Sequence, residues 1–132
     1  MDNPKMMQFS LMDERSEESV LDLLNEMLGF SVESMDFEIP NSLGFAQVML
    51  RDDGYRHSFT ILWPSNIHQK SSSEEVAKKI AIVLNVCVLL ELPSKEASDN
   101  DIWLLINPDG RIRKTPIKYL EDGVVPFAAD GT

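Results

Sequence analysis

The chain has 132 residues, the usual size of one domain, and its 43% hydrophobic and 26% charged residues match an ordinary globular protein and not a disordered one. Its formal net charge is -10, and because proteins bind nucleic acids mainly through cationic side chains, direct binding of DNA or RNA is disfavoured. The longest apolar run, Val86 to Leu90, is far shorter than the roughly 20 residues that a spanning helix needs, so we expect no membrane span.

The first predicted elements are a strand and a helix. Met7, Phe9 and Leu11 alternate with polar residues, the period of two that is typical of a half-buried strand. Ser16 then offers an N-cap for a helix that Gly29 is placed to end. The apolar residues of this helix recur at the spacing of one helical face: Val20, Leu23, Leu24, Met27 and Leu28.

Three strands are expected in the middle of the chain. Met35, Phe37 and Ile39 alternate with acidic residues, and a second extended segment runs from Phe45 to Leu50. Asp53-Gly54 follows and predicts a tight hairpin, because Gly readily adopts a positive φ. The returning strand, over residues 55–63, should place these side chains on one face: Tyr55, His57, Phe59, Ile61 and Trp63.

A second helix and a central strand come next. Ser72 and Glu75 have the spacing of a capping box, and Asn85 is placed to end the helix. The buried stripe of this helix should be Val76, Ala77, Ile80, Ala81, Val83 and Leu84. Residues 86–92 are nearly all Val and Leu, which predicts a strand that is covered on both faces and central in its sheet. A polar linker over residues 93–101 follows.

The last part of the chain is predicted to form a hairpin and a tail. Residues 102–106 form an apolar strand, and Asn107-Pro108-Asp109-Gly110 is a turn sequence. Residues 111–114 should return from the turn before Thr115-Pro116 interrupts the pairing. The chain then runs through residues 117–120 into a Gly- and Pro-containing tail, whose last few residues we expect to be mobile.

These elements follow the order βαβββαβββ. The order predicts an α+β fold, with a mostly antiparallel sheet and two helices packed on it. We find no internal repeat and expect a single domain over residues 1–132.

Candidate catalytic residues are few. His57 and His68 are the only histidines, and together with the single cysteine, Cys87, they cannot supply the closely spaced ligands of a structural zinc site. His57 lies on an apolar strand face, which favours a hydrogen-bonded core histidine over a catalytic base. Cys87 lies among Val and Leu residues, which favours a buried, reduced thiol over a nucleophile. With no nucleophile elbow and no glycine-rich phosphate loop, we expect no enzymatic activity, no cofactor and no metal.

The compartment is inferred from the N-terminus and the cysteine. No basic flank followed by an apolar stretch of signal-peptide length precedes the first strand. A single reduced cysteine suits a reducing compartment. We therefore expect a cytoplasmic protein.

Charge is distributed unevenly along the chain. The first 53 residues carry 12 acidic and 3 basic side chains, whereas the rest carries 10 and 9. On the second helix, two glutamates precede two lysines by four residues, which stabilises a helix. On the first helix, Glu18, Asp22 and Glu26 follow one another at four-residue steps with no base between them, an arrangement that costs on the order of 1 kcal/mol.

This unfavourable arrangement favours a docking surface for a basic protein partner, although a solvated face that aids solubility explains the same pattern. The candidate partner-binding residues are the nine acids between residues 13 and 38: Asp13, Glu14, Glu17, Glu18, Asp22, Glu26, Glu33, Asp36 and Glu38. Trp63 and Trp103 are candidate interface anchors as well, but core packing is the expected role of both.

The layout of the chain resembles that of a known class of proteins. The segment from Met7 to Leu28, the Asp53-Gly54 hairpin and the segment from Glu74 through Trp103 to Gly110 together resemble small acidic bacterial immunity proteins, which are encoded with polymorphic or contact-dependent toxins. The resemblance covers most of the chain as a pattern of elements and charge. It implies a cytoplasmic inhibitor that binds a toxin domain, often a basic nuclease, stoichiometrically, with no catalytic residue and no cofactor.

Two alternatives remain open. The segment from Leu23 to Gly29, followed by strand patterns through Trp63, is also similar to small acidic secretion chaperones, which dimerise and hold an extended effector segment in apolar grooves. An apolar patch on the sheet and a homodimer would favour a chaperone, whereas a monomer with a concentrated acidic face would favour the inhibitor. A deep pocket that holds His57 beside a carboxylate would favour an enzyme.

Overall fold

The computed structural model describes residues 5–34, 43–92 and 102–126, which form two helices and eight strands. In chain order the elements are β1 (Lys5–Leu11), α1 (Glu17–Leu28), β2 (Val32–Ser34), β3 (Gly44–Leu50), β4 (His57–Trp63), α2 (Ser73–Leu84), β5 (Val88–Glu91), β6 (Ile102–Ile106), β7 (Ile112–Leu120) and β8 (Gly123–Pro126). The predicted α+β class, with a mostly antiparallel sheet and two packed helices, is confirmed.

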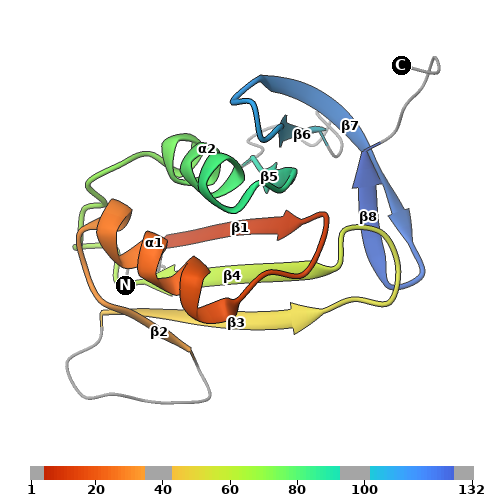
Figure 1. Cartoon of the computed structure of the whole chain (residues 1–132). Helices are drawn as coiled ribbons and strands as arrows, with labels where there is room; N and C mark the ends of the chain where they lie inside the picture. Colours follow the sequence, from red (N-terminus) through yellow and green to blue (C-terminus); the bar gives the residue numbers. More distant parts are fainter. Residues whose placement is uncertain (1–4, 35–42, 93–101, 127–132) are drawn as a thin grey trace.

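The strands form one sheet in the order β2-β3-β4-β1-β5-β6-β7-β8. Every neighbouring pair is antiparallel except β2 and β3, which run parallel. Figure 1 shows α1 and α2 side by side over the sheet, and β7 and β8 curving round to the connection between β3 and β4. There the backbone N–H of Tyr55 donates to the carbonyl oxygen of Val124 at 2.8 Å, so the last strand is fastened to a hairpin about seventy residues earlier.

Both helices begin and end where their capping residues predict. The Ser16 hydroxyl accepts a hydrogen bond from the Ser19 N–H, and Gly29 ends α1 with a φ of +83°. Ser72 and Glu75 form the predicted capping box of α2, whose C-cap Asn85 has a φ of +52°. The ends of both helices therefore follow from local signals.

The sheet has a core on each face. The larger core lies under the helices and includes Phe9, Leu24, Phe59 and Ile80, all fully buried. The second core lies on the opposite face and consists of Tyr55, Leu89, Trp103, Leu105 and Ile117, with Val124 and Val125 of β8 packed against it. Strand β5 contributes to both cores and lies between β1 and β6, so the prediction of a central strand covered on both faces is confirmed.

The predicted position of Tyr55 is wrong. It was expected on the same strand face as His57, but it precedes β4 and belongs to the second core, on the opposite face of the sheet. The reason is the length of the β3–β4 connection, which spans residues 51–56 and is closed by a 2.6 Å hydrogen bond from the Arg51 N–H to the Arg56 carbonyl. The β3–β4 hairpin is confirmed, but it is not the tight turn that was predicted, because residues 51–56 separate the last pair, Leu50 and His57. Gly54 has the positive φ expected of it, +68°.

The C-terminal strands also differ from the prediction. Thr115-Pro116 does not break the strand: both residues pair with β6, and β7 continues to Leu120 with β8 as its partner. Pro116 is the last β7 residue paired with β6 and stands just before the stretch that pairs with β8, a position where a missing N–H costs little. The tail predicted after Leu120 turns at 121–122 into β8, so the described order ends in four strands and not three.

Several predicted segments lie outside the described residues. These are the strand expected from Met35, Phe37 and Ile39, the 93–101 linker and the last residues of the chain. The short strand β2, just before the first of these segments, was not predicted.

Candidate docking surface

The three acids spaced four residues apart on α1 form an exposed row, here called the acidic row: Glu18, Asp22 and Glu26. Between described residues the salt bridges are Arg51–Asp122 and Arg111–Asp109, and neither touches this row. The last turn of α1 contains no basic side chain. Lys70 contacts this end of the helix through its backbone, whose N–H donates to the Leu28 carbonyl. The acidic row is therefore without an ion-pair partner in the part of the chain that the structure describes.

A second group of acids lies at the start of α1. Asp13 and Glu14 are exposed in the β1–α1 connection, and Glu17 is half-buried in the first helical turn. Glu14 and Glu17 border a hollow of about 680 Å³, here called the hollow. Its other lining residues are Arg15, Ser16, Val48, Leu50 and His57. The hollow thus brings two predicted acids together with apolar residues of β3 that were not among the predicted site residues.

His57 forms part of the hollow but is held by the backbone. Its side chain is 4% exposed, its ring centroid lies 4.5 Å from that of Phe59, and its Nδ1 accepts a hydrogen bond from the Arg15 N–H at 3.2 Å. Burial lowers the pKa of His57, and Glu14 opposes this only in part. The ring is therefore neutral near pH 7 with its proton on Nε2. His57 is thus buried and hydrogen-bonded, as predicted. It also lines a hollow beside Glu14 and Glu17, the kind of arrangement that the sequence analysis named as favouring an enzyme.

Arg15, the one base among the predicted acids, binds the end of α2. Its Nε donates to the Leu84 carbonyl and its Nη2 to the Asn85 carbonyl, each at 2.9 Å. These carbonyls belong to the C-terminal end of α2, where a positive charge is favourable and α2 supplies no base in its last turn. Arg15 thus joins the acidic segment to α2, and it forms no salt bridge with a described carboxylate.

The remaining predicted acids do not join these groups. Glu33 is paired with Phe45 in the β2–β3 ladder, while its neighbours Val32 and Ser34 are buried beneath the helices. Because side chains alternate along a strand, Glu33 projects from the face opposite to α1. Asp36 and Glu38 lie outside the described residues. The nine acids therefore do not form one continuous surface over the described part of the chain.

Cys87 was predicted to be buried, but the structure leaves it half-buried. Its Sγ lies 3.6 Å from the Asn107 Oδ1 as a hydrogen-bond donor, and it borders the second core. Burial raises the pKa of the Cys87 thiol, which a hydrogen bond from Tyr55 only partly counteracts. His57, by contrast, lies on the helix-covered face. The structure thus keeps the thiol protonated and does not pair it with a histidine base.

The tryptophans and the second histidine lie where the sequence predicts. Trp63 is buried in the larger core and Trp103 in the second core, as predicted, and His68 is exposed in a loop. Within the described ranges, no three His, Cys, Asp or Glu side chains gather closely enough to hold a metal ion. Neither described helix has the length and apolar character required to cross a bilayer.

Comparison with known proteins gives no relative. No family model matches the chain, and no curated protein or solved structure is significantly similar to it.

Proposed function

We propose that the protein is a non-catalytic binding domain, an immunity protein that acts in the cytoplasm and neutralises a basic toxin domain by stoichiometric binding through its acidic surface. The observation that carries the proposal is the hollow, in which the Glu14 and Glu17 carboxylates meet an apolar wall. The acidic row adds three exposed carboxylates on α1.

The composition of the hollow suits a lysine or arginine side chain of the partner. Leu50 is 53% exposed and Val48 is half-buried, so together they offer an apolar wall for the aliphatic stem of such a side chain. Glu14 and Glu17 carry the opposite charge to its head group and have no salt bridge within the described residues. Because His57 is neutral near pH 7, it does not repel a cation.

The docking surface is tested by reversing one charge beside the hollow. Glu14→Lys should weaken binding of the toxin encoded next to the gene by about tenfold or more, with a slower association rate that depends less on salt. Glu121→Lys is the matched control, because Glu121 is another exposed glutamate in a turn, on the β7–β8 hairpin. Equal binding and equal protection of cells by both variants would remove the hollow from the docking surface.

The non-catalytic part of the proposal has its own test. A His57→Gln, His68→Ala, Cys87→Ala triple variant removes every histidine and the only cysteine. Gln keeps an acceptor that can reach the Arg15 N–H, so the variant should fold. It should protect cells against the toxin as well as the parent chain does. Because His57 lines the hollow, toxin binding is measured alongside; loss of protection at unchanged thermal stability and unchanged toxin binding would support an enzyme instead.

One observation favours the second candidate, a secretion chaperone. On the sheet face away from the helices, Met6, Leu62 and Phe45 stand opposite one another on β1, β4 and β3, and Met6 is 56% exposed. Such an apolar row is suited to self-association or to an extended segment. A homodimer in light scattering that Leu62→Lys converts to a monomer would favour the chaperone, and a monomeric parent chain would favour the inhibitor.

A further inference from the structure

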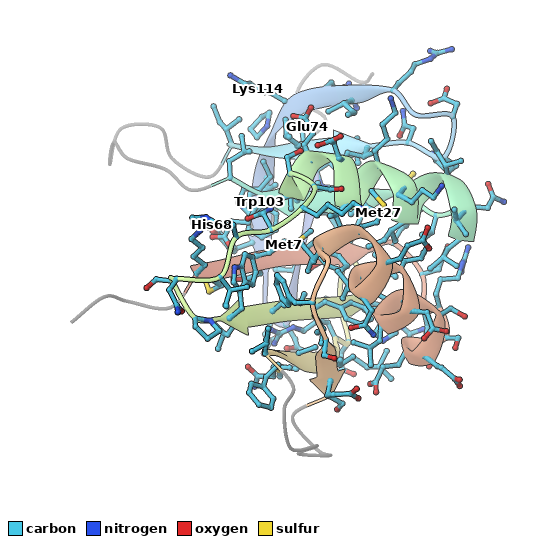
Figure 2. All side chains as sticks on the ribbon, turned by 90° about the vertical axis from the view of Figure 1, so that its left-hand side faces the viewer. Met7, Met27, His68, Glu74, Trp103 and Lys114 are labelled. Atoms are coloured by element: carbon cyan, nitrogen blue, oxygen red, sulfur yellow. The ribbon has the colours of Figure 1, made fainter. Side chains whose placement is uncertain are left out.

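The second half of β3 forms an open edge of the sheet. Strand β2 pairs with β3 only over residues 44–46, and Figure 1 shows it beside the first half of this longer strand. In Figure 2 the same edge lies on the opposite side of the molecule from Lys114 of β7. Residues 47–50 therefore pair with β4 on one side and with no described strand on the other.

The register of the β3–β4 pair shows which backbone groups face this open edge. Arg51, just after β3, donates its N–H to the Arg56 carbonyl across the pair. Because alternate residues of an antiparallel strand bond to the same neighbour, every second residue before Arg51 bonds to β4 as well. The N–H and C=O groups of Val48 and Leu50 therefore point to the open edge. No described backbone group pairs with them.

The open edge lacks the features that usually protect an unpaired strand, which are shortness, charged residues and proline. The strands at the two ends of the sheet have such protection, because β2 has three residues and β8 is fastened to the β3–β4 connection. In contrast, β3 contains no charged residue and no proline. Met49 is 41% and Leu50 53% exposed, so the described elements leave this part of the strand accessible.

The hollow adjoins the open edge and supplies negative charge. The side chains of Val48 and Leu50 line it together with Glu14 and Glu17. A strand added beside β3 would place every second side chain on the same face of the sheet as Val48 and Leu50, next to the two carboxylates. Because neither carboxylate has a salt bridge within the described residues, a lysine or arginine is the side chain that complements them.

We infer that the partner docks by adding an extended strand to β3, with backbone hydrogen bonds to Val48 and Leu50 and a lysine or arginine side chain in the hollow. The inference rests on the proposed docking surface and specifies the form of the partner, a strand of alternating basic and apolar residues. Its apolar side chains would lie on the other face of the sheet, beside Met49. A second copy of β3 does not fit this description, because it would bring no basic residue to the hollow.

Amide hydrogen exchange of the free ¹⁵N-labelled chain tests the open edge before any partner is added. The amides of residues 47 and 49 should be protected, because they bond to β4, whereas those of Val48 and Leu50 should exchange rapidly. Equal protection of all four amides would show that the chain closes this edge by itself, and would overturn the inference.

A capped peptide of alternating residues, acetyl-Val-Lys-Val-Lys-Val-amide, then serves as the probe of the edge. It should shift the amide protons of Val48 and Leu50 downfield with a Kd on the order of 1 mM, and it should slow their exchange. Acetyl-Val-Glu-Val-Glu-Val-amide is the control for charge, and should bind at least about tenfold more weakly. Unchanged Val48 and Leu50 amides with the basic peptide, or an equal response to the acidic one, would refute the added strand.

Two variants of Leu50 separate backbone pairing from side-chain contact. Leu50→Ala removes the apolar side chain and keeps the N–H, whereas Leu50→Pro removes both. Proline is tolerated where a strand N–H faces solvent, so both variants should fold. Leu50→Pro should bind the basic peptide about fivefold more weakly than Leu50→Ala does, because one hydrogen bond is lost. Equal binding by the two variants would exclude backbone pairing at this position and with it the inference.

Toxin binding by the same variants separates this inference from the docking proposal. Glu14→Lys tests the charge of the hollow, whatever backbone conformation the partner has. Weaker toxin binding in Glu14→Lys, together with equal toxin binding by Leu50→Ala and Leu50→Pro, would overturn the added strand and retain the docking surface. Weaker toxin binding in both Glu14→Lys and Leu50→Pro, relative to Leu50→Ala, is the expected result.

Discussion

At the scale of single residues, the contacts of Arg15 and His57 hold three elements together. The Arg15 N–H binds the ring of His57 on β4, and its guanidinium binds the last carbonyls of α2. The partners are 42 and about 70 residues away in the chain. The sequence shows Arg15 only as a lone base among acids, so no local pattern could have predicted that it is used as a helix cap.

The buried His57 ring makes stability depend on pH. Burial lowers the folded-state pKa of His57 below its ordinary value of about 6.5, so the unfolded chain takes up the proton first as the pH falls. Stability is full above that ordinary value and is lost progressively below it, towards the lowered folded pKa. Glu14, which shares the hollow, limits the loss because it stabilises the protonated ring.

Urea unfolding between about pH 7 and pH 5 checks this expectation. His57→Gln should abolish the part of the decline that belongs to His57, since Gln does not titrate. His68→Gln is the control, because His68 is exposed and its removal should leave the decline almost unchanged. A decline that is as steep in His57→Gln as in the parent chain would show that other groups cause it.

At the scale of elements, the features that depend on local contacts could be predicted from the sequence, whereas those that depend on long-range contacts could not. The caps Ser16, Ser72 and Asn85 and the turn at Gly110 act through bonds within a few residues, and each lies where the sequence places it. The pairing of β7 with β8 and the place of Tyr55 in the second core depend on contacts across the whole fold, which no short pattern encodes. The candidate site follows the same rule: the acidic row was predictable from four-residue spacing, but the hollow was not.

The two helices provide a matched pair of charge reversals. Asp22→Lys should stabilise the chain by about 0.5 kcal/mol, because it turns two like-charge pairs on α1 into favourable ones. Glu74→Lys should destabilise it by a similar amount, because Glu74 lies in the first turn of α2, where a negative charge is favourable. Both side chains are exposed, so urea unfolding measures the difference without a change of packing.

The same Asp22→Lys variant tests the role of the acidic row in binding. If the row belongs to the docking surface, association with a basic toxin should become slower and less sensitive to salt while stability rises. Stopped-flow kinetics at two salt concentrations measure both quantities. An unchanged association rate would identify the row as a solvated face and leave the hollow as the acidic contact.

At the scale of the whole molecule, the second core depends on the return of the chain to the β3–β4 connection. Strand β8 packs Val124 and Val125 against that core, and the backbones of the two segments meet at Tyr55 and Val124. Gly54 stands at this crossing with a φ of +68°, and a Cβ there would collide with the Val124 carbonyl. Gly54 is thus required both for its backbone angle and for the close approach of β8.

Gly110 allows these two requirements to be separated. Its φ is +91°, but the nearest atom to a Cβ built there is the Cε of Lys78, at 3.4 Å on a flexible side chain. Gly110→Ala should therefore cost only the backbone strain, about 1 kcal/mol, whereas Gly54→Ala should cost more than about 2 kcal/mol because the collision is added. Urea unfolding measures both costs.

Gly54→Ala should also loosen β8 and expose Trp103, which shifts tryptophan emission to the red under native conditions, and Gly110→Ala should not. An equal decrease in the free energy of unfolding for the two variants would mean that β8 can move aside without destabilising the chain, and that the second core is stable without its last strand.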